Sequence, residues 1–517
     1  MKPAPNLAPS PAPTTAPSPA PDDVADWPEL VTAALLGTDR RPLPALLDRA
    51  AVQAVARRAG LRPGPASPLP PAAPADPRPA LPEAARQRLA MLLPARAGSA
   101  GGTLANLNEL LPQWVAAAAR HGYRCPAALV PPLLDAARTR SELRADAVTL
   151  AGPLGRWLAD RNPDWRFVLR TPLTGEQATG PDQRLWQEGL FAERVTHLTL
   201  LRRRDPDAAR ELLRSTWAGE RAEDRLLFLD ALQEGLAAGD EPFLEAALND
   251  RAKNVRATAA ELLSALPGSA LAERMARRAL ACVTLSSTAD GARLTVHPPT
   301  ACDPEMRHDG IPVGSPTGRA DRAFWLGEIV AATPLDTWVT AYGSPAELLA
   351  LPVSDAWQQD LRDAWSRAAV RQGDARWARA LLALPAPDPI PVGSAAKLLA
   401  VLPPLERADW TAGFLAGHGL ADAFQLLVAC PAPWSEALGR AVLGALERVA
   451  ATGGYPWSHS GVIGVAERAL PPEAAAELSA LAEHTVPAWA ETFARLGATL
   501  RLRAAMFAEL TEVAAWG

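Results

Sequence analysis

Four side chains with metal-binding chemistry occur close together in the middle of the chain, at Cys282, His297, Cys302 and His308. Zinc takes four nitrogen or sulfur ligands, usually supplied as close pairs such as C-x-x-C, which fix half of the site in advance. Here 14, 4 and 5 residues separate successive candidates, so the sequence offers no such pair. We therefore expect no bound metal, and a metal-dependent enzyme centred on this segment is kept only as an alternative function.

The motifs that bind nucleotides or activate a serine are absent from the sequence. It contains neither G-x-x-x-x-G-K-[ST] nor G-x-G-x-x-G, and Gly393–Lys397 places a lysine after one glycine without the glycine frame that wraps phosphate. Gly314–Gly318 has the letters of a G-x-S-x-G elbow out of register, with a proline where the helix should begin. We expect no catalytic residue and no cofactor site, and therefore a non-enzymatic protein.

A basic run at Arg202–Arg204, followed by Arg210 and Arg214, could contact phosphate groups. Acidic residues such as Asp205 and Glu211 interleave with these arginines, and the whole chain has 52 basic and 57 acidic residues, for a net charge of -5. This pattern favours a solvent-exposed, ion-paired helix face. A nucleic-acid-binding module resembling the HEAT-like DNA glycosylases remains the second function to test.

The composition indicates a folded, water-soluble protein of several packed parts. Hydrophobic residues make up 48% of the 517 residues, which is enough for sizeable cores. The four cysteines are far apart, which favours a reducing compartment. The sequence has no uncharged apolar run of 18 residues and no signal-peptide core, so we expect a cytoplasmic protein without a membrane-spanning helix.

Helical periodicity is clearest from Glu223 to Leu266. Apolar residues recur there at steps of three and four, in two short runs separated by a polar turn at residues 249–253. Such a pair of antiparallel helices cannot cover both of its apolar faces, so neighbouring pairs must stack on it. The periodicity predicts an all-α fold, an α-solenoid of antiparallel helix pairs in two lobes.

The pattern changes between residues 281 and 320. Val283 and Leu285, then Leu294 and Val296, alternate around an Asp-Gly turn, which predicts a small β-hairpin followed by irregular, proline-rich chain. The predicted organisation is a disordered proline-rich tail at 1–24, an N-terminal helical lobe at 25–280 with a proline-rich loop at 63–82, an insertion at 281–320 and a C-terminal helical lobe at 321–517. In the C-terminal part, frequent tryptophans at helix ends are expected to pack between helices.

The segment around residue 250 resembles a HEAT repeat. The matching residues are Ala247–Asp250, then Asn254-Val255-Arg256, then Ala259-Ala260-x-Leu262-Leu263. The resemblance implies that Asp250 caps backbone amides at the turn and that Arg256 bonds back to a turn carboxylate. It also implies that Val255 belongs to the apolar face of the second helix.

Several other stretches resemble a bacterial family, domain of unknown function 5691. They are Leu30–Arg41, Gly155–Ala159 with Asn162-Pro163-x-Trp165, Trp186-x-x-Gly189, Asp240–Ser269, and Asp309-Gly310 leading to Trp325-Leu326. The resemblance covers nearly the whole chain from Trp27 onward, and it carries over no catalytic residue. It implies genes beside those of a SWIM zinc-finger protein, a MoxR-type AAA+ ATPase and a von Willebrand factor A protein.

Such ATPases act as chaperones, so the resemblance implies a scaffold or adaptor in a MoxR/von Willebrand factor A system, with those three proteins as partners. Two polar groups could form a docking edge for such a partner, namely Thr38-Asp39-Arg40-Arg41 and Arg156-Trp157. Helix capping and packing between helices is the interpretation we favour for both groups.

Overall fold

The computed structural model describes residues 27–36, 43–59, 70–93, 107–171, 183–288, 291–316, 318–384 and 391–511. The chain divides into two units, Met1–Ala72 and Ala73–Gly517. In the first unit, α1 (Trp27–Leu35) contacts α2 (Leu43–Ala59). Leu30 of α1 is buried, whereas Val31 and Leu35 are exposed. The predicted helix is therefore present, but only part of its apolar stripe is covered within this unit.

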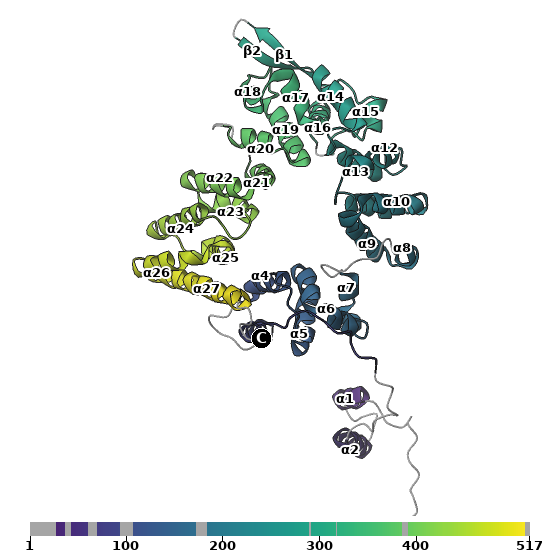
Figure 1. The fold of residues 1–517 in the computed structure, drawn as a ribbon, viewed down its shortest axis with the longest axis vertical. Coiled ribbons are helices and arrows are strands. Elements are labelled where there is room, and N and C mark those ends of the chain that lie inside the picture. The colour runs from purple at the N-terminus through teal and green to yellow at the C-terminus, as the bar shows by residue number, and fades with distance from the viewer. Residues whose placement is uncertain are drawn as a thin grey trace, which may run out of the picture. The chain divides into compact units, whose positions relative to one another are not determined.

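The second unit is built from helices and one two-stranded sheet, as far as it is described (Figure 1). Before the sheet lie α3 (Glu83–Leu92), α4 (Leu107–Arg120), α5 (Val130–Thr139), α6 (Arg144–Ala159), α7 (Phe167–Arg170), α8 (Gln183–Glu188), α9 (Phe191–Arg204), α10 (Pro206–Thr216), α11 (Ala222–Ala231), α12 (Glu241–Ala247), α13 (Lys253–Ser264) and α14 (Ala270–Cys282). The strands are β1 (Val283–Thr288) and β2 (Gly291–Val296). After them lie α15 (Pro304–His308), α16 (Asp321–Ala332), α17 (Leu335–Tyr342), α18 (Pro345–Ala350), α19 (Gln358–Gln372), α20 (Ala375–Leu382), α21 (Val392–Val401), α22 (Pro404–Gly417), α23 (Leu420–Ala429), α24 (Glu436–Ala451), α25 (Ser460–Ala469), α26 (Ala475–Glu483) and α27 (Pro487–Thr511). The predicted all-α fold with a small β-containing insertion is confirmed.

Local sequence explains where many of these helices begin. The carboxylate of Asp205 accepts a hydrogen bond from the backbone N–H of Ala208, and Pro206 fills the first position of α10, where no N–H is needed. Ser269 caps α14 in the same way by accepting from the N–H of Ala272. These caps satisfy amides that the helix itself leaves unpaired.

The described residues of the second unit form three hydrophobic cores. The largest runs from Trp186 to Leu426 and includes Val283, Leu294 and Val296 of the hairpin, so the insertion shares a core with the helices on both sides of it. A second core spans residues 81–168, and a third spans residues 408–500. Most helices pack on elements close to them in sequence, for example α14 on α16, α16 on α19 and α19 on α21. Such local packing is typical of stacked helical repeats.

The predicted hairpin pairs antiparallel in a register that places Val283 opposite Val296. A further bridge joins Leu294 to Val353, where the Leu294 N–H donates to Pro352 O at 2.9 Å. The Tyr342 hydroxyl donates to Val283 O at 2.6 Å. The hairpin is therefore bound to the chain that follows it, and it is not a free flap.

Three tryptophans in the second half of the chain pack between helices, as the sequence interpretation expects. Trp338, Trp365 and Trp377 are all buried. Their rings form a continuous series, with centroids 5.7 Å apart between Trp338 and Trp365 and 5.6 Å apart between Trp365 and Trp377. These rings lie inside the core, where they cannot stack on an external ligand.

The last helix packs against the first helices of the second unit. Arg88 of α3 and Glu509 of α27 form an ion pair at 2.6 Å, and the Tyr123 hydroxyl donates to Leu510 O at 3.0 Å. Met506 and Leu510 of α27 lie in the core formed by residues 81–168. Figure 1 shows α27 beside α4, which it also contacts. Two regions far apart in sequence are therefore held together, a contact that the sequence pattern did not predict.

The described part of the proline-rich 63–82 stretch, residues 70–82, contains no helix and is mostly exposed, but it is fastened to the fold at Arg78 and Leu81. Leu81 is buried, and the Arg78 guanidinium pairs with Asp76 at 2.6 Å and donates to Thr149 O at 2.5 Å. The prediction that no part of this stretch belongs to the core is wrong for Leu81. The predicted lobe boundaries remain a prediction. No described helix is both long and apolar enough to cross a membrane.

Candidate functional site

The predicted polar turn lies just before α13, and its polar residues stabilise the chain itself. The Asp250 carboxylate accepts from the backbone N–H of Ala252 at 2.8 Å and pairs with Arg225 of α11 at 2.9 Å. Arg256 donates to the backbone carbonyl of Asp250 at 2.8 Å, whereas a bond to a turn carboxylate was expected. Val255 is buried. Arg225 takes the carboxylate and thereby links α11 to this turn.

The predicted docking residues lie in two places. Thr38, Asp39, Arg40 and Arg41 are outside the described residues. Arg156 in α6 donates to the backbone carbonyl of Thr171 at 3.0 Å. The guanidinium of Arg161 lies over the Trp157 ring, 4.0 Å from its centroid. These contacts within the chain are what a packing role requires.

The four metal-ligand candidates do not form a cluster. Cys282 is buried in the core, and His297 forms a backbone hydrogen bond to Cys282 O at 2.7 Å. The Cys302 thiol faces Ile311 O at 3.7 Å, and His308 Nε2 lies 3.3 Å from Asn249 Oδ1. Within the described ranges, no three His, Cys, Asp or Glu side chains are placed to hold a metal ion. The metal-dependent alternative therefore has no support in this geometry.

Arg202, the first residue of the basic run, is completely buried, so the expectation of an exposed ion-paired face is wrong for it. Its guanidinium pairs with both carboxylate oxygens of Asp240, at 2.8 and 2.7 Å. It also donates to the backbone carbonyls of residues Pro206, Leu232, Glu234 and Gly235. Arg203 is exposed, as expected, and pairs with Glu234 at 3.2 Å. Arg202 is thus a structural cation that no phosphate can reach.

A second buried carboxylate, Asp309, fastens the insertion to α14. Its oxygens accept from Arg274 Nε at 2.9 Å and Arg278 Nη1 at 2.5 Å. Burial alone raises the pKa of this carboxyl, but the hydrogen bonds from the two arginines outweigh it and hold the pKa below 3.8. Gly310 follows with a φ of +88°, and a Cβ built on it meets the Cβ of Ala260 at 2.5 Å. The Asp-Gly pair is therefore a packing motif that joins the insertion to α13 and α14.

We expect Asp309 to make stability depend on pH. A carboxyl whose folded-state pKa is lowered stabilises the protein above its unfolded-state pKa, and this contribution disappears as the pH falls through the folded-state value. The destabilisation by Asp309→Asn, measured by urea unfolding, should therefore be largest near pH 7 and shrink below about pH 4. A difference between the two proteins that stays constant down to pH 3 would contradict this role.

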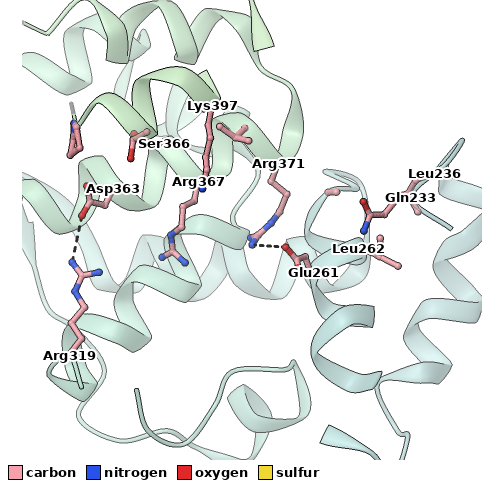
Figure 2. A pocket seen from close by; sticks show the side chains of 14 residues that line it. Gln233, Leu236, Glu261, Leu262, Arg319, Asp363, Ser366, Arg367, Arg371 and Lys397 are labelled. Carbon is pink, nitrogen blue, oxygen red and sulfur yellow. Dashed lines mark ion pairs between the residues drawn. The ribbon is translucent and has the colours of Figure 1, made fainter. Parts of the chain in front are cut away.

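A cavity opens between α13 and the turn after α11 on one side and α19 and α21 on the other. Its volume is about 880 Å³, within the range of small-molecule sites. The lining residues are Gln233, Leu236, Glu261, Leu262, Ala265, Arg319, Asp363, Ser366, Arg367, Val370, Arg371, Pro391, Ser394 and Lys397. Figure 2 shows Arg367, Arg371 and Lys397 on the α19–α21 side, facing Gln233, Glu261 and Leu262. We call this space the cationic cavity because its lining has four cations and two carboxylates.

The four cations differ in how well they are neutralised. Arg319 pairs with Asp360, and its guanidinium is 3.8 Å from the carboxylate of Asp363. Arg367 pairs with Glu328 at 2.6 Å. The other two cations of the lining have a more distant carboxylate partner or none.

Arg371 donates to Ala331 O at 3.1 Å, but its nearest carboxylate, Glu261, is 3.9 Å away and mostly exposed. Burial lowers the pKa of the Arg371 guanidinium, with Arg367 acting in the same direction and Glu261 acting against it. Lys397 is exposed and forms no ion pair or side-chain hydrogen bond with any described residue. Arg371 and Lys397 are therefore the least neutralised cations of the cavity.

The lining is suited to binding an anion and poorly suited to catalysis. It contains no histidine, cysteine or tyrosine, and the Ser366 hydroxyl donates to Arg362 O at 2.8 Å. The other serine of the lining, Ser394, has no described hydrogen bond to Lys397 or to a carboxylate. The described contacts therefore do not pair a nucleophile with a general base, as hydrolytic chemistry requires. Sequence reasoning missed the site because its members are spread from residue 233 to residue 397. The only local signal was Gly393–Lys397, which places Ser394 and Lys397 one helical turn apart.

The comparisons with known proteins identify a family and no individual relative. No curated protein matches the chain, and no solved structure does. The sequence profile of one family matches residues 29–510, which takes in α1, the buried Arg202–Asp240 pair, the insertion and the cationic cavity. The chain therefore belongs to the Family of unknown function (DUF5691).

Proposed function

We propose that this protein is a non-enzymatic scaffold or adaptor that works by binding other proteins in the cytoplasm. Its charged residues with the most elaborate contacts, Arg202, Asp240 and Asp309, serve the fold itself. The cationic cavity lacks the paired groups that acid–base or nucleophilic catalysis needs. A stack of helices that mostly contact near neighbours also leaves long surfaces free for partners.

The observation that carries this proposal is an exposed aromatic surface on the C-terminal helices, which we call the aromatic patch. Tyr455 and Trp457, at the turn before α25, are 63% and 74% exposed, and their rings stack with centroids 6.0 Å apart. Phe424 of α23 lies against Gly461 at the start of α25, and Val428 is exposed one turn further along α23. Large exposed aromatic side chains are typical of the centres of protein–protein interfaces.

The partners we propose come from the family resemblance. They are a MoxR-type AAA+ ATPase and a von Willebrand factor A protein, with a SWIM zinc-finger protein as a further member of the system. In this proposal the chain links the ATPase to the protein on which it acts. The glycosylase-like nucleic-acid module is less favoured because Arg202 is buried and Arg203, Arg210 and Arg214 pair with carboxylates. The metal-dependent enzyme is less favoured because its four ligand candidates have other contacts.

We expect the purified chain to retain the MoxR-type ATPase or the von Willebrand factor A protein of its own organism in a pulldown at micromolar concentration. Replacing Tyr455 and Trp457 by serine should weaken that retention at least tenfold, because hot-spot aromatics contribute about 2 kcal/mol or more each. Val313→Ser, which also removes an exposed apolar side chain but lies in the insertion, is the matched control. Retention of neither protein would contradict the proposed partners, and equal retention by both variants would contradict the role of the aromatic patch.

A further inference from the structure

The cationic cavity combines features that a scaffold does not need. Its lining comes from three separate parts of the chain: residues 233–265, Arg319, and residues 363–397. The lining side chains carry four positive and two negative charges, and Arg319 and Arg367 each have a further carboxylate partner just outside the lining. Lys397 has no such partner, and Arg371 has only a distant one. A fold that only had to pack its helices would fill this space with apolar groups or neutralise the charges.

Arg371 lies where an anionic ligand could reach its guanidinium. Arg371 lines both the cationic cavity and a smaller adjoining cavity of about 300 Å³, and Glu261 is shared by the two. The guanidinium of Arg371 is largely withdrawn from solvent, yet its nearest carboxylate is 3.9 Å away. A second anion at this position would replace a weak partner with a strong charge-assisted hydrogen bond.

Lys397 supplies an independent observation. It is one of only three lysines in the chain and the only lysine that lines the cavity. It has no carboxylate partner among the described residues. Pro391, the N-cap of α21, and Ser394 in its first turn line the same cavity, so the positive end of that helix also faces it. Lys397 lies in the second turn of this helix, and a lysine together with the positive end of a helix can hold a phosphate group.

The remaining lining indicates the size and nature of the rest of the ligand. Leu236, Leu262, Ala265 and Val370 provide apolar surface, and Gln233 provides an amide that can both donate and accept. A volume of about 880 Å³ exceeds what a lone phosphate requires and is suited to a ligand of nucleotide size. We infer that the cationic cavity binds a small organic phosphate, with Lys397 and Arg371 holding its phosphate oxygens and the apolar wall contacting its organic part.

This inference does not depend on the proposed scaffold function, since it concerns a different surface from the aromatic patch. It involves binding only, and no bond in the ligand is broken. The absence of a glycine-rich phosphate loop is consistent with it, because here side chains from several helices supply the positive charge.

The test uses the full chain and isothermal titration calorimetry with three probes, namely ADP, inorganic pyrophosphate and adenosine. We expect ADP and pyrophosphate to bind at millimolar concentration or below and adenosine to bind far more weakly. Lys397→Ala should weaken both phosphate probes roughly tenfold, since it removes one charge-assisted hydrogen bond. Lys253→Ala, which removes the other lysine of the described chain from an exposed position at the start of α13, should leave binding unchanged.

Three results would overturn the inference. They are the failure of both phosphate probes to bind, binding of adenosine as tight as that of ADP, and identical affinities for the wild-type chain and Lys397→Ala. Because Lys397 is exposed and unpaired, its replacement should leave the thermal unfolding midpoint unchanged. A loss of binding by Lys397→Ala therefore reports on the ligand site and not on the fold.

Discussion

Replacing Arg202 by leucine should lower the free energy of unfolding by roughly 3–5 kcal/mol, the cost of breaking a buried ion pair by removing one partner. The substitution leaves the Asp240 carboxylate buried without its countercharge. It also removes the donor that satisfies four backbone carbonyls between α9 and the start of α12. Urea unfolding followed by tryptophan fluorescence measures the change.

Arg203→Leu is the matched control, because it changes the neighbouring arginine in the same helix to the same residue. Arg203 is exposed and its partner Glu234 is partly exposed, so this change should cost no more than about 1 kcal/mol. Adding Asp240→Asn to Arg202→Leu should recover part of the loss, since the amide removes the stranded charge. Equal destabilisation by Arg202→Leu and Arg203→Leu would show that Arg202 does not have the buried role seen here.

Gly310→Ala should destabilise the protein by roughly 2–4 kcal/mol, from two separate effects. The φ of +88° at this position is strained for any residue with a side chain. The new methyl group would also lie 2.5 Å from the Cβ of Ala260, which cannot rotate away because it is fixed to the backbone of α13. The irregular chain after the hairpin would then have to move away from α13, and the contacts of Asp309 with Arg274 and Arg278 would be distorted.

Gly318→Ala separates the two effects. Gly318 has a φ of +73° in the same segment, but no atom lies within 4 Å of a Cβ built there, so only the backbone strain of about 1 kcal/mol is expected. The double substitution Gly310→Ala with Ala260→Gly removes the clash and should be less destabilising than the sum of the two single changes. Additive free energies of unfolding in this cycle would mean that the close approach of the two residues is not what requires glycine.

Much of the fold could be predicted from local patterns. The three- and four-residue spacing of leucines around residue 230 predicted helices, and alternation around the Asp-Gly turn predicted the hairpin that pairs Val283 with Val296. Arg202 was wrongly predicted to be exposed because three successive arginines are typical of a solvent-exposed helix face. Its position four residues after the buried Leu198, on the same helix face, is the signal that could have placed it inside.

The rest depends on contacts between distant residues. Nothing near Glu509 indicates that it pairs with Arg88, and nothing near Arg371 indicates that Glu261 and Lys397 line the same cavity. Such sites are assembled by stacking helices whose order in space follows from packing along the whole unit. A local pattern can show that Lys397 follows Ser394 by one helical turn, but not what the turn faces.

We propose that this chain acts by holding proteins together. The most direct test is sedimentation velocity of the purified chain mixed at micromolar concentration with the purified MoxR-type ATPase and von Willebrand factor A protein of the same organism. We expect a faster-sedimenting complex of defined stoichiometry that contains the chain, and its loss when Tyr455 and Trp457 are both replaced by serine. If every component sediments at its own rate in all mixtures, the proposed scaffold role is wrong.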